Sequence, residues 1–240
     1  MASGKAIIGG MLGRFLFREA RVGQVREMSP HFRWMELMGE DLRDVEWFPG
    51  DKVQVFLPGV GMRTYTPLGW DAALGGTRFL VYLHGRSPGA EWGRAVKAGD
   101  RCQLFGPRGS LGLASLQGPV VLFGDETSFA VAHALKSTSI PAKDIAHVFE
   151  VSSSPESHSV LSELDLGNSV IVQRTPGDAH LAEVESKLRE ALLRHGRANL
   201  VMTGRARSIQ TLRSQLRASP ILLATQKVKA YWSEGKVGLD

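Results

Sequence analysis

The pattern of apolar residues changes character at Gly118-Pro119, and this change strongly constrains the fold. Before it, short strand-like segments are separated by glycine and proline turns, with one small helical segment. Such spacing indicates an antiparallel barrel. After it, compact apolar runs alternate with helical segments, and this order indicates a doubly wound parallel sheet. The sequence therefore predicts two domains, an N-terminal antiparallel β-barrel and a C-terminal domain built on a doubly wound parallel sheet.

The first half is expected to hold one short helix, Gly89–Val96, and strands over Glu19–Glu27, Phe32–Met38, Lys52–Leu57, Arg63–Thr66, Thr77–His84 and Arg101–Phe105. The second half is expected to alternate strands over Pro119–Gly124, Ile145–Val151, Ser169–Gln173 and Asn199–Met202 with helices over Ser128–Lys136, Ser157–Leu164, Asp178–His195 and Ser208–Arg217. The segment Gly106–Ser110 is interpreted as a turn that closes the barrel. Residues 1–15 are predicted to be a loose arm, 16–115 the barrel and 119–240 the second domain.

Composition excludes several classes of protein. The 240-residue chain has a net charge of +5, but acidic residues are interleaved with the basic ones and no nucleic-acid-binding motif is readable. No apolar run approaches the roughly 18 residues of a membrane span, and the N-terminus is too broken by glycine for a convincing signal peptide. Cys102 is the only cysteine, so we expect a buried thiol rather than a disulfide or cysteine-held metal. A cytoplasmic protein that binds neither nucleic acid nor membrane is expected.

The segment Arg63-Thr64-Tyr65-Thr66 is the most informative for function. Residues two apart on a strand point to the same face, so Arg63 and Tyr65 are expected to share one. A guanidinium fork suits a phosphate, and a flat phenol suits a flat ring. A dinucleotide flavin offers both parts. The four residues alone are also compatible with an ordinary half-exposed strand.

Further motifs occur in a fixed order along the chain, and together they resemble the siderophore-interacting proteins. This family contains FAD-dependent ferric-siderophore reductases of the ferredoxin–NADP reductase superfamily. The resemblance runs from about Val22 to Gly235. It rests on Arg63-Thr64-Tyr65-Thr66, His84-Gly85, Gly89-Ala90-Glu91-Trp92, Ala98-Gly99-Asp100, Gly106-Pro107-Arg108-Gly109-Ser110, Gly124-Asp125-Glu126-Thr127 and Tyr231-Trp232-Ser233-Glu234-Gly235. It implies a flavin-binding β-barrel followed by a nicotinamide-binding domain.

The resemblance also implies which residues contact FAD. Arg63 would hold a flavin phosphate, Tyr65 would pack on the isoalloxazine, and Thr66 would bond near N5, with Thr64 between them. The remaining cofactor-binding residues that it implies are His84, Gly85, Gly89, Ala90 and Trp92. A helix N-terminus is a natural pyrophosphate site, and Gly89-Ala90 would supply it. Ala90 replaces the family's usual serine, so one phosphate bond is expected to be missing. Trp92 either covers the flavin or, as is more usual, packs in the core.

The nicotinamide side is expected at the carboxyl ends of the strands in the second half. Asp125 and Thr127 are the cofactor-binding candidates there, and Asp125 equally suits a helix N-cap. Glu150 favours NADH as electron donor, whereas the serines in Val151-Ser152-Ser153-Ser154 favour NADPH, so both donors stay open. Arg205 stands where the family usually has an acid. This inverts the local charge and puts the nicotinamide step in more doubt than the flavin site.

Three lysines near the C-terminus, Lys227, Lys229 and Lys236, are the candidate substrate-binding residues. They form either a solvated tail or a basic rim that attracts an anionic ferric siderophore. No set of side chains has metal-ligand spacing, so iron is expected to arrive inside its chelate. The expected protein is a monomer or weak dimer that passes electrons from NADPH or NADH through FAD to Fe(III), with no side chain obligatory as catalyst. A general flavin reductase, a ferredoxin-linked reductase, a non-enzymatic flavin-binding protein and a basic nucleic-acid-binding protein are the alternatives.

Overall fold

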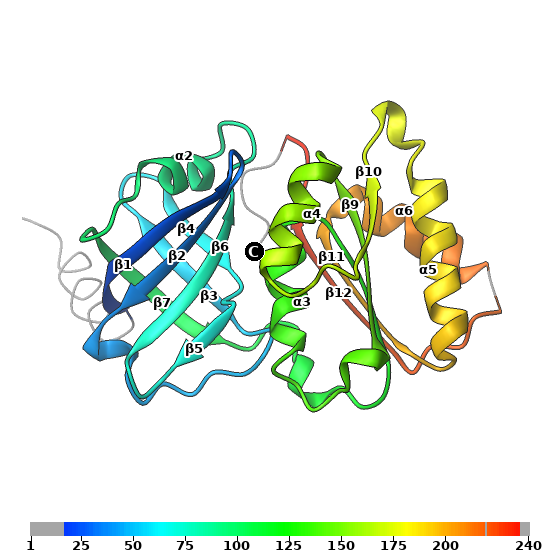
Figure 1. The fold of residues 1–240 in the computed structure, drawn as a ribbon, viewed down its shortest axis with the longest axis horizontal. Helices are drawn as coiled ribbons and strands as arrows, with labels where there is room; N and C mark the ends of the chain where they lie inside the picture. Colours follow the sequence, from blue (N-terminus) through cyan, green and yellow to red (C-terminus); the bar gives the residue numbers. More distant parts are fainter. Residues whose placement is uncertain (1–16, 219, 236–240) are drawn as a thin grey trace, which may run out of the picture. The chain divides into compact units, whose positions relative to one another are not determined.

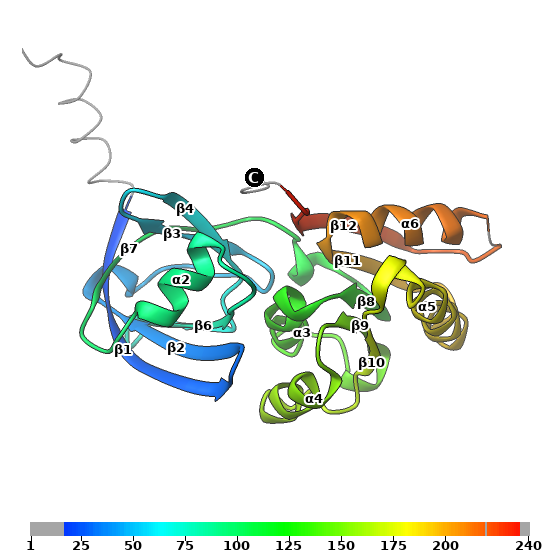
Figure 2. The ribbon, with the colours of Figure 1, turned by 90° about the horizontal axis from the view of Figure 1, so that it is seen from above.

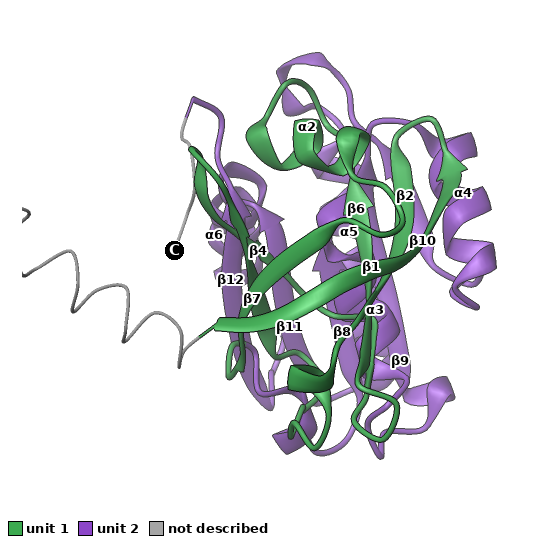
Figure 3. Ribbon diagram, turned by 90° about the vertical axis from the view of Figure 1, so that its left-hand side faces the viewer, with its two compact units in different colours: residues 1–110 green, residues 111–240 purple. Residues whose placement is uncertain are grey.

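The structure is a computed structural model that describes residues 17–218 and 220–235. The predicted arm, residues 1–15, and Lys236 lie outside the described residues. The chain divides into two compact units, residues 1–110 and residues 111–240 (Figure 3). All the antiparallel pairing lies in the first unit and all the parallel pairing in the second.

The first unit is an antiparallel sheet that wraps around an apolar core (Figure 1). In its described part, seven strands pair in the order β4-β3-β7-β1-β2-β6-β5. Helix α2 (Pro88–Ala95) and the 3-10 turn η1 (Glu40–Leu42) interrupt them. The strands are β1 (Phe17–Ser29), β2 (Phe32–Met38), β3 (Lys52–Leu57), β4 (Gly61–Tyr65), β5 (Gly69–Asp71), β6 (Gly76–Tyr82) and β7 (Arg101–Arg108).

The core of this unit follows from alternation along its strands. Val53, Val55 and Leu57 of β3 are buried, whereas Phe56 between them is exposed. Cys102 lies in the same core, as predicted for a buried thiol, and burial raises its pKa to about 11. Helix α2 approaches the sheet closely because of Gly93. A Cβ there would lie 2.8 Å from side-chain atoms of both Val81 and Leu83.

The second unit is a parallel sheet with helices on both faces. Figures 1 and 2 show α3 and α4 on one face and α5 and α6 on the other. Its strand order within the described residues is β10-β9-β8-β11-β12. The strands are β8 (Val120–Gly124), β9 (Ile145–Val151), β10 (Val170–Gln173), β11 (Asn199–Arg205) and β12 (Thr225–Trp232). The helices are α3 (Phe129–Leu135), α4 (Ser154–Glu163), α5 (Leu181–His195) and α6 (Ala206–Arg217), with 3-10 turns η2 (Leu113–Ser115), η3 (Glu126–Ser128), η4 (Ala142–Asp144) and η5 (Pro176–Asp178).

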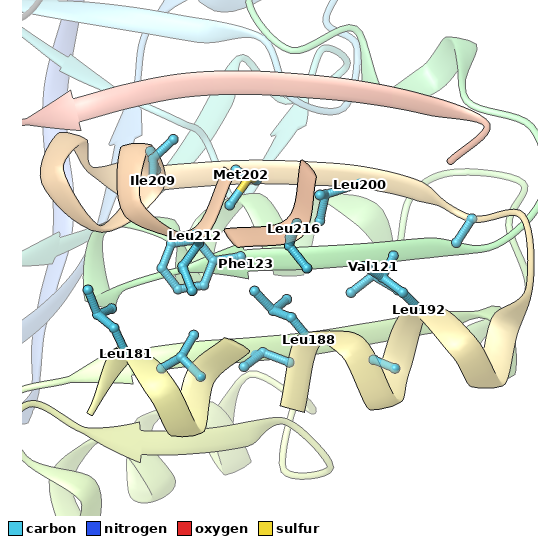
Figure 4. Close-up of a cluster of buried hydrophobic side chains, with 14 of the residues drawn as sticks. Val121, Phe123, Leu181, Leu188, Leu192, Leu200, Met202, Ile209, Leu212 and Leu216 are labelled. Carbon is cyan, nitrogen blue, oxygen red and sulfur yellow. The ribbon is translucent and has the colours of Figure 1, made fainter. Parts of the chain in front are cut away.

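The apolar stripe predicted for α5 forms one wall of the main core of this unit (Figure 4). Leu181 and Leu188 of α5 face Phe123 of β8, and α6 closes the core from above. The helix ends at Gly196, as its sequence predicts. Helices α5 and α6 pack over β8 and β11, and the polar residues described below lie at the carboxyl ends of the strands.

The predicted fold is confirmed: an antiparallel β-barrel region is followed by a doubly wound parallel sheet. Two local interpretations were wrong. The segment Thr225–Trp232 is the edge strand β12 rather than an unstructured tail, and its mixture of lysine, glutamine and alanine hides the strand because one side of an edge strand faces solvent. The predicted turn Gly106–Ser110 begins inside β7, which continues to Arg108.

Candidate flavin and dinucleotide sites

Strand β4 presents Arg63 and Tyr65 on one face, as their spacing predicts. Tyr65 pairs with Val53 and Arg63 with Val55, so both side chains stand on the face that carries the core valines. Thr64 points the other way, is exposed, and accepts a hydrogen bond of 3.3 Å from the Gln54 amide. Thr66 lies just beyond the strand end and is half-buried.

The N-terminus of α2 lies against these two side chains. A Cβ added to Gly89 would lie 3.2 Å from the Tyr65 hydroxyl oxygen and 3.8 Å from Arg63 Cδ. The absence of a side chain at Gly89 therefore lets the N-terminus of α2 approach the phenol of Tyr65 and the side chain of Arg63 closely. These are the groups that a phosphate-bearing aromatic ligand requires. Gly89 of α2 lies 24 positions after Tyr65 and 26 after Arg63 in the sequence, and the fold brings it beside these two residues of β4.

Ser87 is a residue of this site that the sequence analysis missed. Its hydroxyl caps α2 by accepting a 3.3 Å hydrogen bond from the Ala90 N–H, and its carbonyl accepts from the Glu91 N–H. Pro88 has no N–H to offer. Of the first turn, Gly89 therefore supplies the N–H that is left for a ligand. Ala90 itself is 2 % exposed, so its methyl group is buried in the protein.

Tyr65 is held by aromatic neighbours. Its ring centroid lies 5.8 Å from that of Phe79 and 5.7 Å from that of Trp92, and both Tyr65 and Trp92 pack against the core. Trp92 thus supports the tyrosine in this structure. Burial raises the pKa of the Tyr65 phenol, while the charge of Arg63 opposes the rise. The phenol is protonated throughout the physiological range, which suits a packing and hydrogen-bonding role.

The turn between β6 and α2 is fixed by an arginine. Arg94 donates hydrogen bonds of 2.9 Å to the Leu83 carbonyl and 2.8 Å to the Gly85 carbonyl. His84, between them, is half-buried and stacks on Tyr82 with ring centroids 5.7 Å apart. Gly85 has a φ of +56°, a conformation in which a side chain is strained. The turn is therefore rigid at the point where the chain enters the capped helix.

The second unit carries a buried polar cluster at the carboxyl ends of its strands. Asp125, directly after β8, caps η3 and is fully buried. Its carboxylate accepts 2.9 Å from the Thr127 N–H and 2.7 Å from Trp232 Nε1. Burial and then the charge of Glu126 raise the pKa of Asp125 to about 6, although the charge of Arg174 and the hydrogen bonds from the Thr127 hydroxyl and Trp232 Nε1 oppose the rise. Both Asp125 and Thr127 are engaged within the protein.

Arg174 follows β10 and is the cation on which this cluster converges. It contacts both carboxylate oxygens of Glu126, at 2.7 and 3.2 Å, and the Ser152 hydroxyl at 2.7 Å. Burial alone would lower the pKa of Arg174, but the surrounding carboxylates raise it. Glu150 is fully buried and bonded to His180 at 2.8 Å, so its carboxylate faces the interior. Glu150 is thus removed from the choice between NADH and NADPH that its sequence position suggested.

Arg205, the residue that departs from the family pattern, finds acidic partners inside this unit. It is 6 % exposed and pairs with Asp178 and Glu234, each at 2.5 Å. Its guanidinium also lies 6.0 Å from the Trp232 ring centroid. The charge inversion is therefore compensated within the protein, and Arg205 is committed to structure.

Two of the three predicted basic residues lie on β12. Lys227 pairs with Val201 and Lys229 with Thr203, so alternation places both lysines on one face of the strand, before the register shifts at Tyr231. The opposite face carries Ala230, which packs toward the α5–α6 core. Both lysines are half-buried.

Comparisons with known proteins are consistent with this arrangement. Residues 59–111, which include β4 and α2, match the family model of the siderophore-interacting FAD-binding domain. The resemblance predicted from the sequence is thereby confirmed, and so is FAD as the cofactor. A comparison with the curated proteins gives no match.

Solved structures share the fold over nearly the whole chain. A siderophore utilization protein from T. fusca is 23 % identical with a TM-score of 0.72, the match covering 93 % of this chain and 95 % of that one. The siderophore-interacting protein SipS from Aeromonas hydrophila is 20 % identical with a TM-score of 0.73, covering 92 % of both chains. A ferredoxin NADP+ reductase from Neisseria gonorrhoeae, with bound FAD and NADP, is 13 % identical with a TM-score of 0.68, covering 90 % of this chain and 98 % of that one. With the FAD-binding domain, this fold supports a flavin oxidoreductase.

Within residues 17–218 and 220–235, no helix combines the length and apolar character that crossing a membrane requires. The same residues contain no group of three or more histidine, cysteine or acidic side chains arranged to hold a metal ion.

Proposed function

We propose that this protein is an FAD-dependent oxidoreductase that passes electrons from NADPH or NADH to Fe(III) in a ferric siderophore, releasing Fe(II). The observation that carries the proposal is the convergence of Arg63, Tyr65 and Gly89 within the segment that matches the FAD-binding family model. Fe(III) is the substrate here, and it enters within its chelate.

The groups around Gly89 fit FAD by their chemistry. Arg63 would bind a phosphate through its guanidinium, and the Gly89 N–H would donate to the same pyrophosphate at the positive end of α2. Tyr65 would pack on the ring system, and Thr66 would lie near the ring edge. FAD, when bound, accepts a hydride and gives up electrons singly. The protein's part is to bind, orient and shield.

The electron donor is proposed to bind at the carboxyl ends of the parallel strands, where open α/β sheets take their ligands. Ser152, which follows β9, is exposed at that edge, whereas Glu150 and Arg205 are buried and paired. Thr127 is half-buried at the same edge. A shared fold with a reductase that has bound NADP supports a nicotinamide dinucleotide as donor. The choice between NADPH and NADH belongs to the test.

Lys227 and Lys229 are the proposed basic rim for an anionic chelate. Lys236, the third lysine, lies outside the described residues. A ferredoxin-linked reductase is the second candidate function, and the similarity in fold to the ferredoxin reductase of carbazole 1,9a-dioxygenase favours it, with 16 % identity and a TM-score of 0.70. A cytoplasmic location and a monomeric or weakly dimeric state remain predictions.

The test is anaerobic reduction of the purified holoprotein with NADPH, NADH or reduced ferredoxin in turn, followed by addition of a ferric siderophore and a coloured Fe(II) chelator. Bleaching of the flavin bands by a nicotinamide donor, and Fe(II) capture in proportion to the donor consumed, are expected. Bleaching by reduced ferredoxin and by neither nicotinamide would make ferredoxin the electron donor in place of NADPH or NADH. A flavin that no donor bleaches would make the protein a flavin binder rather than an enzyme.

A further inference from the structure

We propose that Arg174 is a positioning residue of the donor site: it holds two loops at the carboxyl edge of the parallel sheet in the arrangement that binds the nicotinamide dinucleotide. This inference rests on the function proposed above. It goes beyond that function because it assigns the site's geometry to a residue that no motif contains and that acts through others.

Three hydrogen-bonded contacts close a triangle at this edge. Arg174 binds the Glu126 carboxylate through both terminal nitrogens, at 2.7 and 3.2 Å. Its Nη1 also donates to the Ser152 hydroxyl at 2.7 Å. The Ser152 N–H donates to Glu126 Oε1 at 2.5 Å, which completes the triangle. Each corner follows a different strand: Glu126 follows β8, Ser152 follows β9 and Arg174 follows β10.

The guanidinium is additionally tied to the backbone. Its Nη2 donates to the Glu150 carbonyl at 3.2 Å, and the Arg174 N–H donates to the Val151 carbonyl at 2.7 Å. The side chain of Arg174 is 18 % exposed and that of Glu126 only 1 %. Most of the hydrogen-bonding capacity of Arg174 is therefore spent inward, so the residue acts through the loops rather than as a phosphate ligand.

The loop that Arg174 holds leads directly into α4. Ser152 is exposed and Ser153 is the N-cap residue, whose own side chain does not cap the helix; the Ser154 N–H instead donates to Gln173 Oε1 at 3.3 Å. The hydroxyl group that Ser152 brings to the edge is suited to a ribose. A planar fork reaches Glu126 and Ser152 together, whereas a lysine ammonium keeps the charge but loses the fixed two-sided geometry.

The experiment compares Arg174→Lys, Ser152→Ala and the matched control Arg189→Lys in the holoprotein. Arg189 is also a partly buried arginine of the second unit, bonded to Glu185 at 2.6 Å and to the Gln215 carbonyl at 3.2 Å. Binding of NADP+ and NAD+ is measured by isothermal titration calorimetry, together with the FAD content, the melting temperature, and KM and kcat for both reduced donors. Binding is thus measured independently of turnover.

We expect Arg174→Lys to weaken binding of the preferred nucleotide about tenfold, or ~1.4 kcal/mol, and to raise KM alike. Ser152→Ala should weaken nucleotide binding less, in the same direction. In both variants kcat at saturating donor and the FAD content should stay unchanged, and Arg189→Lys should bind nucleotide like the wild type. Equal nucleotide affinity in Arg174→Lys and wild type would overturn the proposal, as would a loss of affinity that Arg189→Lys reproduces. Failure of the wild type to bind either nucleotide would instead overturn the proposed donor, which separates the two failures.

Discussion

The two units hold their charged residues in opposite ways. In the first unit, Arg63 is half-buried and donates a hydrogen bond of 2.6 Å to the carbonyl of Met62. At the sheet edge of the second unit, Arg174 and Arg205 are surrounded by carboxylates of the same unit. An arginine near a strand end is therefore a proposed phosphate-binding residue in one setting and a structural cation in the other. The difference lies in which acids the fold brings beside it.

Removal of the structural cation should have the largest effect. Arg174→Met leaves Asp125, Glu126 and Glu150 in a buried site without their shared counter-charge. Loss of one partner from a buried ionic network costs about 3–5 kcal/mol, so we expect a fall of that size in the free energy of unfolding. Urea denaturation measures it. Adding Glu126→Gln should recover part of the loss, and an unchanged midpoint in Arg174→Met would show that this cluster does not stabilise the unit.

The corresponding change in the first unit should affect the ligand and spare the fold. Arg63→Ala removes a charge-assisted phosphate contact worth about 1.5–3 kcal/mol, so FAD affinity should fall roughly ten- to a hundredfold. Flavin fluorescence titration measures the affinity, and Arg78→Ala is the matched control because Arg78 is an exposed arginine of the same sheet. Stoichiometric FAD with unchanged affinity in Arg63→Ala would remove Arg63 from the site.

Protonation should distinguish the two units in a pH titration. The pKa of Asp125 is raised to about 6 in the folded protein from an ordinary value of 3.8. Because the folded state binds this proton more tightly, the contribution of Asp125 favours folding at low pH and is lost as pH rises from about 4 through 6. Asp125→Asn keeps an acceptor for Trp232 Nε1 and does not titrate. The stability of the wild type relative to this variant should therefore decline across that window, and parallel pH profiles would contradict the raised pKa.

Sequence reasoning predicted the local geometry of the first unit better than that of the strand ends in the second unit, for a physical reason. Arg63 and Tyr65 are two residues apart on a single strand, so local periodicity predicts their shared face. Arg174, Glu126 and Ser152 meet only through the order of three parallel strands, and nothing local in the sequence marks that meeting. Ser87 was within reach, because a serine before proline at the start of a helical segment is a cap signal. Glu150 was weighed as an acid that favours NADH, and Arg205 as an inversion of charge at the cofactor edge, because burial by tertiary partners is invisible in their residue types.

A methyl group at the helix N-terminus tests how closely the first site is shaped. Gly89→Ala puts a carbon 3.2 Å from the Tyr65 hydroxyl, so the methyl must displace either the phenol or the ligand. We expect FAD affinity to fall about fivefold, or ~1 kcal/mol, with the melting temperature held or raised because alanine is the better helix former. Gly109→Ala is the control, since a Cβ there meets no atom within 4 Å. If both variants bind FAD as tightly as the wild type, the cofactor does not lie against Gly89.

The smallest expected effect belongs to the half-buried lysines of β12, which stand between the two cases. Lys227 and Lys229 share one strand face and would attract an anionic ferric chelate through partly screened charge. Replacing both by glutamine should raise KM for anionic chelates a few-fold at low salt. The difference should vanish as the Debye length falls from about 10 Å at 0.1 M to about 3 Å at 1 M. Flavin reduction by NADPH or NADH should be unaffected. A neutral ferric hydroxamate is the control substrate: if its KM rises as much as that of an anionic chelate, the lysines support the strand and not the capture of substrate.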